Sequence, residues 1–163
     1  MRILGIDPGY ATVGYGIIEN DNGKLRPIGY GAIETPPSLS TAERLILIEK
    51  RTTELVLDVT PDEIAIEELF FNTNITTGIK VAQARGVILL SCAKLCGALY
   101  EYTPLQIKST VTGNGTANKT QVQFMVRSLL RLKETPKPDD AAVALAAAIC
   151  HAFTAQGIKR GLK

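Results

Sequence analysis

The sequence predicts an α/β sandwich in which a mixed, five-stranded sheet is covered by helices on both faces. Short apolar runs bounded by turn residues predict strands at residues 2–7, 13–19, 25–33, 63–67 and 99–102. The first three runs follow one another as hairpins, and the last two alternate with helical patterns, which is typical of this fold class. The 163 residues are 45% apolar and 21% charged, so we expect one domain (1–163) with a mobile tail from about residue 156.

Turn and capping residues predict where the elements begin and end. Asp7-Pro8-Gly9 ends the first strand, and Asp21-Asn22-Gly23 indicates a tight hairpin between the second and third strands. Ser40 or Thr41 can cap the first helix, and Gly97 can end the second. Helices are expected at residues 42–58, 74–96, 104–112, 118–131 and from 139 or 140 to about 155.

The cysteines and the N-terminus are typical of a cytosolic protein. No apolar run approaches the roughly 18–20 residues of a membrane span, and the chain opens on a strand rather than on a signal peptide. Cys92, Cys96 and Cys150 are an odd set without a CxxC pair, and we interpret them as buried apolar residues. The alternative, a metal site that includes His151, lacks the ligand spacing of zinc motifs.

Charge is distributed unevenly along the chain, although the net charge is only +2. Residues 1–68 carry 6 basic and 12 acidic side chains, whereas residues 104–163 carry 9 basic and 3 acidic ones. This asymmetry indicates a polyanionic partner for the second half. The acidic first half needs another purpose, and metal binding is a natural candidate.

Two acidic residues end predicted inner strands. Asp7 follows the first strand, and Glu67 ends the fourth. In open α/β sheets, sites form at the carboxyl ends of strands, and two carboxylates there repel each other unless a hard cation such as Mg²⁺ lies between them. A third acid could come from Asp139 or Asp140 at the start of the last helix. Each residue also has an ordinary interpretation, as a turn residue, a solvated strand end or a helix cap.

Several sequence blocks, taken together and in order, resemble the RuvC family of Holliday-junction resolvases. The resemblance runs from residue 2 to about 153. It is carried by Ile6-Asp7-Pro8-Gly9, Gly14-Tyr15-Gly16, residues 65–70 (AIEELF), 83–87 (QARGV), 102–108 (YTPLQIK), 119–123 (KTQVQ) and 138–142 (PDDAA).

The resemblance implies an RNase-H-like fold and a homodimeric nuclease of DNA recombination and repair. Such a protein binds four-way junctions and makes paired nicks by phosphodiester hydrolysis, using two Mg²⁺ ions, for which Mn²⁺ can substitute. Asp7, Glu67 and Asp140 match three of the family's four catalytic, metal-binding carboxylates, with Asp7 bridging the ions. The resemblance also implies a RuvA–RuvB branch-migration complex as partner.

The chain departs from the family pattern at the fourth carboxylate, where Val143 stands three residues after Asp140. Positions i and i+3 share a helix face, so Val143 should face the metal site without offering an oxygen ligand. Three explanations stay open. Asp139 could act as a substitute, although it lies about 100° round the helix from Asp140. The chain could be a natural variant that binds junctions and cuts poorly, or it could have been inactivated by substitution.

The resemblance assigns DNA contacts to several further residues. Phe70 is expected to stack on an unpaired base near the crossover, and Lys108 and Lys119 to contact phosphates near the scissile bond. Arg85 is expected to have either a structural role or a DNA contact. We weigh two further functions: a junction-binding protein with weak or no cleavage, and a fragment of an ATP-using sugar kinase or chaperone. The chain is too short for the two lobes of the latter.

Overall fold

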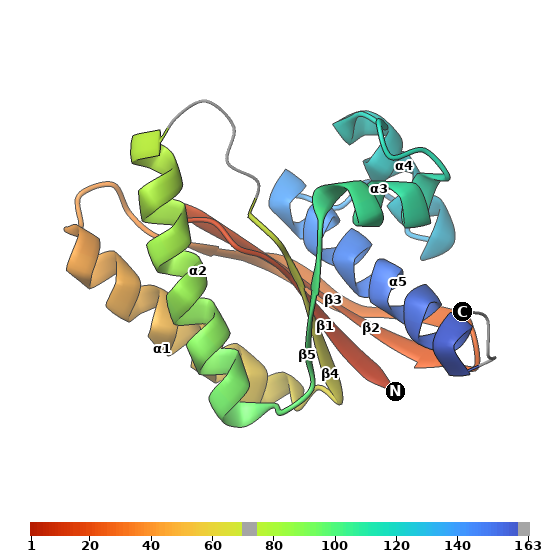
Figure 1. The fold of residues 1–163 in the computed structure, drawn as a ribbon, viewed down its shortest axis with the longest axis horizontal. Coiled ribbons are helices and arrows are strands. Elements are labelled where there is room, and N and C mark those ends of the chain that lie inside the picture. The colour runs from red at the N-terminus through yellow and green to blue at the C-terminus, as the bar shows by residue number, and fades with distance from the viewer. Residues whose placement is uncertain (70–74, 160–163) are drawn as a thin grey trace.

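A mixed sheet of five strands, in the order β3-β2-β1-β4-β5, forms the centre of the molecule. The computed structural model describes residues 1–69 and 75–159 (Figure 1). β1 pairs with β2 and β2 with β3 in antiparallel fashion, whereas β1 pairs with β4 and β4 with β5 in parallel. The strands are β1 (Arg2–Asp7), β2 (Thr12–Asp21), β3 (Lys24–Glu34), β4 (Glu63–Glu67) and β5 (Leu99–Tyr102).

Helices cover both faces of this sheet, which confirms the predicted fold class (Figure 1). α1 and α2 pack against each other on one face, and α5 crosses the other face with α3 and α4 packed on its outer side. The helices are α1 (Thr41–Val59), α2 (Ile75–Leu95), α3 (Pro104–Thr112), α4 (Lys119–Leu129) and α5 (Asp139–Lys159). No helix in the described ranges is both long and apolar enough to cross a membrane.

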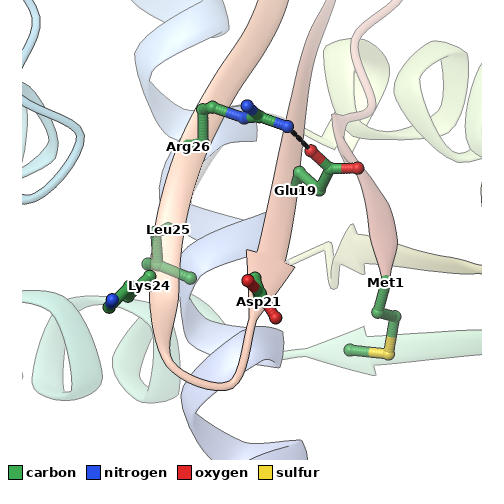
Figure 2. Close-up of a pocket in the computed structure, with 6 residues that line it drawn as sticks. All are labelled: Met1, Glu19, Asp21, Lys24, Leu25 and Arg26. Carbon is green, nitrogen blue, oxygen red and sulfur yellow. Dashed lines mark hydrogen bonds and ion pairs between the residues drawn. The ribbon is translucent and has the colours of Figure 1, made fainter.

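The predicted hairpin turn and the predicted cap of the first helix have the conformations that their residue types favour. Asn22 and Gly23 have φ angles of 51° and 96°, as a two-residue hairpin turn requires. Figure 2 shows this end of the hairpin, where Arg26 of β3 forms an ion pair with Glu19 of β2. Ser40, rather than Thr41, caps α1 through a capping box with Glu43.

Glycines on the sheet allow α5 to approach it closely. A Cβ at Gly5 of β1 would lie 2.9 Å from the backbone N of Ala148 and would overlap the carbonyl of Ala144. A Cβ at Gly14 of β2 would likewise lie 2.9 Å from the Cβ of Asp140. The facing surface of α5 is rich in alanine, and its alanines from 141 to 148 are fully buried. Small residues on both surfaces therefore fix where the start of α5 lies over β1 and β2.

The cysteines and His151 belong to the packed interior. Cys92, Cys96 and Cys150 are buried free thiols, as predicted, and burial raises the pKa of Cys92 to about 12. The His151 ring nitrogens lie 2.7 Å from the Tyr102 hydroxyl and 2.6 Å from a Glu63 carboxylate oxygen. This buried network ties the later part of α5 to β4 and β5.

We predict that Gly5→Ala lowers the free energy of unfolding by about 1–3 kcal/mol, because the added methyl group meets helix backbone that cannot move aside. Urea unfolding measures the change. Gly97→Ala is the matched control, because a Cβ there meets no atom within 4 Å. It should change the stability by less than about 0.5 kcal/mol. Equal stability of the two variants would show that the glycine does not set the helix position.

Candidate functional site

Asp7 and Glu67 lie side by side at the carboxyl ends of adjacent parallel strands. β1 and β4 are paired up to Ile6 and Ile66, so the next residue of each strand is an acid at the same edge. Side chains alternate along a strand, and Asp7 therefore shares the face of Gly5, against which α5 packs. Two separate chain segments thus present their carboxyl groups beneath the start of α5.

The first turn of α5 brings a third carboxylate to these two. Gly14 of β2 pairs with Asp7, and the close approach of α5 at Gly14 places Asp140 beside them. The carboxylates line one pocket with a volume of about 270 Å³. Its lining residues are Asp7, Glu67, Pro104, Ile107, Lys108, Lys119, Val122, Gln123, Asp140, Ala142 and Val143.

Burial and mutual repulsion raise the pKa values of the two strand-end carboxyls. The pKa of Asp7 is held well above its usual range, first by burial and then by the negative charges of Glu67 and Asp140. Burial also raises the pKa of Glu67, although a hydrogen bond from Asp7 and the charge of Lys108 oppose this shift. A proton on one of these carboxyls therefore reduces their mutual repulsion. A bound cation would have the same effect.

The residues of the pocket suit one hard cation better than two. Asp7 and Glu67 offer oxygen ligands on adjacent strands, and Asp140 lies close enough to act on the charge of Asp7. Within residues 1–69 and 75–159, however, no group of three or more His, Cys, Asp or Glu side chains is arranged to hold a metal ion. Val143 lines the pocket beside Asp140, as the helical spacing predicts, and presents only methyl groups.

Asp139 points to different partners from those of Asp140. Its carboxylate lies 2.8 Å from the Lys119 ammonium and accepts a hydrogen bond of 2.8 Å from the Gln123 amide. Both contacts lower the pKa of Asp139. It is also absent from the residues that line the pocket. In this structure Asp139 joins α4 to α5 instead of replacing the missing carboxylate.

Two lysines enter the pocket from α3 and α4. Lys119 is the first residue of α4, whose start is fixed by a capping box between Asn118 and Gln121. Its charge acts on Asp7 and Asp140, and these acids together with Asp139 raise the pKa of Lys119. Lys108 of α3 acts on Glu67. The pocket therefore combines carboxylates with two cations that can meet a phosphate.

Arg85, another predicted DNA-contact residue, lies outside this pocket. Arg85 of α2 forms an ion pair with Glu101 of β5, and it is not among the residues that line the pocket. Phe70 lies outside the described residues. Sequence reasoning gave no role to Gln123, which lines the pocket and binds Asp139. Its position four residues after Lys119, on the same helix face, was the available signal.

We predict that Asp7→Asn stabilises the metal-free protein at pH 7.5. Because the folded-state pKa of Asp7 is raised, the wild-type chain loses stability as pH rises from the ordinary carboxyl pKa through the raised one. One pKa unit corresponds to about 1.4 kcal/mol, so the variant should gain at least about 1 kcal/mol above that range. Thermal unfolding in EDTA across pH measures this. The exposed Glu49→Gln variant on α1 should stay within about 0.5 kcal/mol of wild type. A less stable Asp7→Asn variant at pH 7.5 would contradict the repulsion described above.

Comparison with known proteins identifies the family. The family model "Crossover junction endodeoxyribonuclease RuvC" matches residues 3–151. The RuvC protein of Clostridioides difficile (strain 630) is 57% identical over 154 residues, covering 94% of this chain and 91% of that protein. That of Alkaliphilus oremlandii (strain OhILAs) is 52% identical over 154 residues, covering 94% of each chain.

Solved structures agree with this assignment. Thermus thermophilus RuvC in complex with a Holliday junction substrate superposes with a TM-score of 0.89 at 35% identity, over 99% of this chain and 97% of that chain. The yeast mitochondrial Holliday junction resolvase Ydc2 has a TM-score of 0.68 at 13% identity, over 98% of this chain and 84% of that chain, and shares the fold. The chain therefore belongs to the RuvC family of crossover junction endodeoxyribonucleases.

Proposed function

We propose that this chain binds four-way DNA junctions and resolves them by metal-dependent hydrolysis of phosphodiester bonds, in DNA recombination and repair. The observation that carries the proposal is the pocket in which Asp7, Glu67 and Asp140 lie together with Lys108 and Lys119. Carboxylates hold the hard cations that phosphoryl chemistry uses, and lysines contact phosphates. The proposed catalytic and metal-binding residues are Asp7, Glu67 and Asp140.

The chain's own groups can bind and orient a phosphodiester in this pocket. Three acids alone would repel DNA, and the Lys108 and Lys119 ammonium groups offset that repulsion from two helices. Bound Mg²⁺, or Mn²⁺ in its place, would supply charge neutralisation and a more acidic water. The family pattern uses two such ions, and here Asp7 and Glu67 would hold the first. The raised pKa of the buried Asp7 carboxyl favours its protonated form when no cation offsets the neighbouring negative charges.

An alternative function is junction binding with weak or no cleavage. Val143 favours this alternative, because the position that faces the pocket beside Asp140 carries no oxygen. Lys108 and Lys119 lie on other helices than Val143, so the residue at position 143 should not change their contacts with phosphates. DNA binding should therefore be retained even if cleavage is lost.

Paired nicks need two copies of the pocket, and we propose a homodimer. The long helix α2 carries exposed apolar side chains suited to such contact, among them Ile79 and Leu90, which are 53% and 57% exposed. These two residues are eleven positions apart and share one helix face. On the family resemblance, we also propose that Phe70 stacks on a base, that Arg85 has a DNA contact or a structural role, and that the chain cooperates with a RuvA–RuvB complex. On the sequence, we propose a cytoplasmic location.

The experiment that tests the function incubates the protein with a synthetic four-way junction and Mg²⁺ or Mn²⁺. We expect specific junction binding, with nicking well below that of Val143→Asp, because the variant restores the missing carboxylate. Val143→Ala is the matched control and should not increase nicking, since it adds no oxygen. Nicking by the wild-type chain as fast as by Val143→Asp would reject the junction-binding alternative. Failure of both proteins to bind the junction would reject the proposed function.

We predict that Lys119→Gln lowers the salt slope of junction binding by about one unit, because one fewer phosphate is neutralised. Fluorescence anisotropy with a labelled junction at several salt concentrations measures the slope. Lys50→Gln, at an exposed position of α1, is the control and should leave the slope unchanged. If both variants and the wild type have the same salt slope, Lys119 does not contact a phosphate of the junction.

A further inference from the structure

The pocket contains carboxylates for one cation, but it lacks the fourth carboxylate that the family pattern has at position 143. Asp7 and Glu67 follow paired residues of adjacent parallel strands and line the same pocket. The other side of the pocket holds Asp140 and Val143, the latter without a ligand atom. A second ion on that side would have Asp140 and a shared Asp7 oxygen, but no further carboxylate from α5.

Asp139 is not available to complete that side. Its carboxylate is bound to the Lys119 ammonium and to the Gln123 amide, both on α4. Moving it into the pocket would break both contacts and require the first turn of α5 to rotate. That turn is fixed by the close approach of Asp140 to Gly14.

Lys119 supplies positive charge on the same side. Its ammonium lies 2.8 Å from Asp139, and its charge acts on both Asp140 and Asp7. The side chain is 57% exposed and lines the pocket, so it can face both the acids and a bound phosphate. A positive charge on this side of the pocket adds to the electrostatic cost of binding a second cation there.

We propose that each chain takes a single divalent cation, between Asp7 and Glu67, because Val143 removes one carboxylate from the side of the pocket where a second ion would bind. This inference rests on the proposed function, because it concerns the metal content of the same site. It distinguishes the chain from the two-ion arrangement that its family pattern implies.

The test counts bound Mn²⁺ ions on the full-length protein without DNA. The protein is titrated with MnCl₂, and free Mn²⁺ is measured by electron paramagnetic resonance. The wild-type chain should bind one ion per chain, and Val143→Asp should bind two. Two ions per wild-type chain would overturn the proposal, and that measurement decides the matter even if Val143→Asp does not fold. A folded Val143→Asp variant that still binds one ion would also overturn it, since Val143 would then not be the cause.

Two further variants test the roles given to the α4–α5 contacts. Lys119→Gln should bind the first Mn²⁺ at least several-fold more tightly, because a unit positive charge that repels the divalent ion is removed from the pocket. Lys50→Gln on α1 is the control and should bind Mn²⁺ as the wild type does. Unchanged affinity in Lys119→Gln would remove Lys119 from the site's charge balance. Asp139→Asn should still bind one ion, whereas complete loss of binding would identify Asp139 as a ligand and overturn the assignment.

The outcomes separate this inference from the function on which it rests. One bound Mn²⁺ in a protein that fails to bind junctions would reject the proposed function and leave the stoichiometry standing. Two bound Mn²⁺ ions in a protein that nicks junctions would reject the single-cation site and leave the function standing.

Discussion

Repulsion among carboxylates that the fold forces together is the constraint on which the site depends. Asp7 and Glu67 are placed at one sheet edge by the parallel pairing of β1 and β4, and Asp140 is added by the packing of α5 on Gly5 and Gly14. None of these acids can move away without loss of strand pairing or of the buried alanine surface. The raised pKa of Asp7 reflects this confinement, and a cation is the ligand that relieves it.

The same architecture explains why positive charge comes from a different part of the chain. The sheet and the start of α5 supply acids, whereas α3 and α4 pack on the outer side of α5 and bring Lys108 and Lys119 to the pocket rim. The acidic first half of the sequence thus supplies Asp7 and Glu67, whereas the basic second half supplies both lysines and Asp140. A phosphate bound between them would meet lysines on one side and carboxylates on the other. Val143 breaks the proposed arrangement at one point, and we therefore expect binding and cleavage to be separable experimentally.

Much of this fold could be predicted from the sequence, because its signals are local. The hairpin at Asn22-Gly23 and the strand-end acids Asp7 and Glu67 depend on neighbouring residues and were predicted where the structure has them. The helix cap was predicted to within one residue, as Ser40 or Thr41, and the structure has Ser40. The proximity of Asp140 to Asp7 followed only from the family resemblance. It depends on the contact between Gly14 and Asp140, which are 126 residues apart in the sequence. No local sequence pattern predicts such a contact.

The side chains around the site were harder to predict than its acids. Asp139 and Asp140 are equivalent as helix-start acids in the sequence, and only the phase of α5 decides that one lines the pocket while the other binds Lys119 and Gln123. Arg85 pairs with Glu101, a contact between a helix and an edge strand that spacing alone does not reveal.

Anomalous diffraction from crystals soaked in MnCl₂ tests the central claim most directly. If confinement of Asp7 and Glu67 creates the cation site, a manganese peak should lie within direct coordination distance of oxygens from both residues, and soaked Asp7→Asn crystals should lack it. Manganese bound elsewhere, with Asp7 and Glu67 still sharing a proton, would contradict the account.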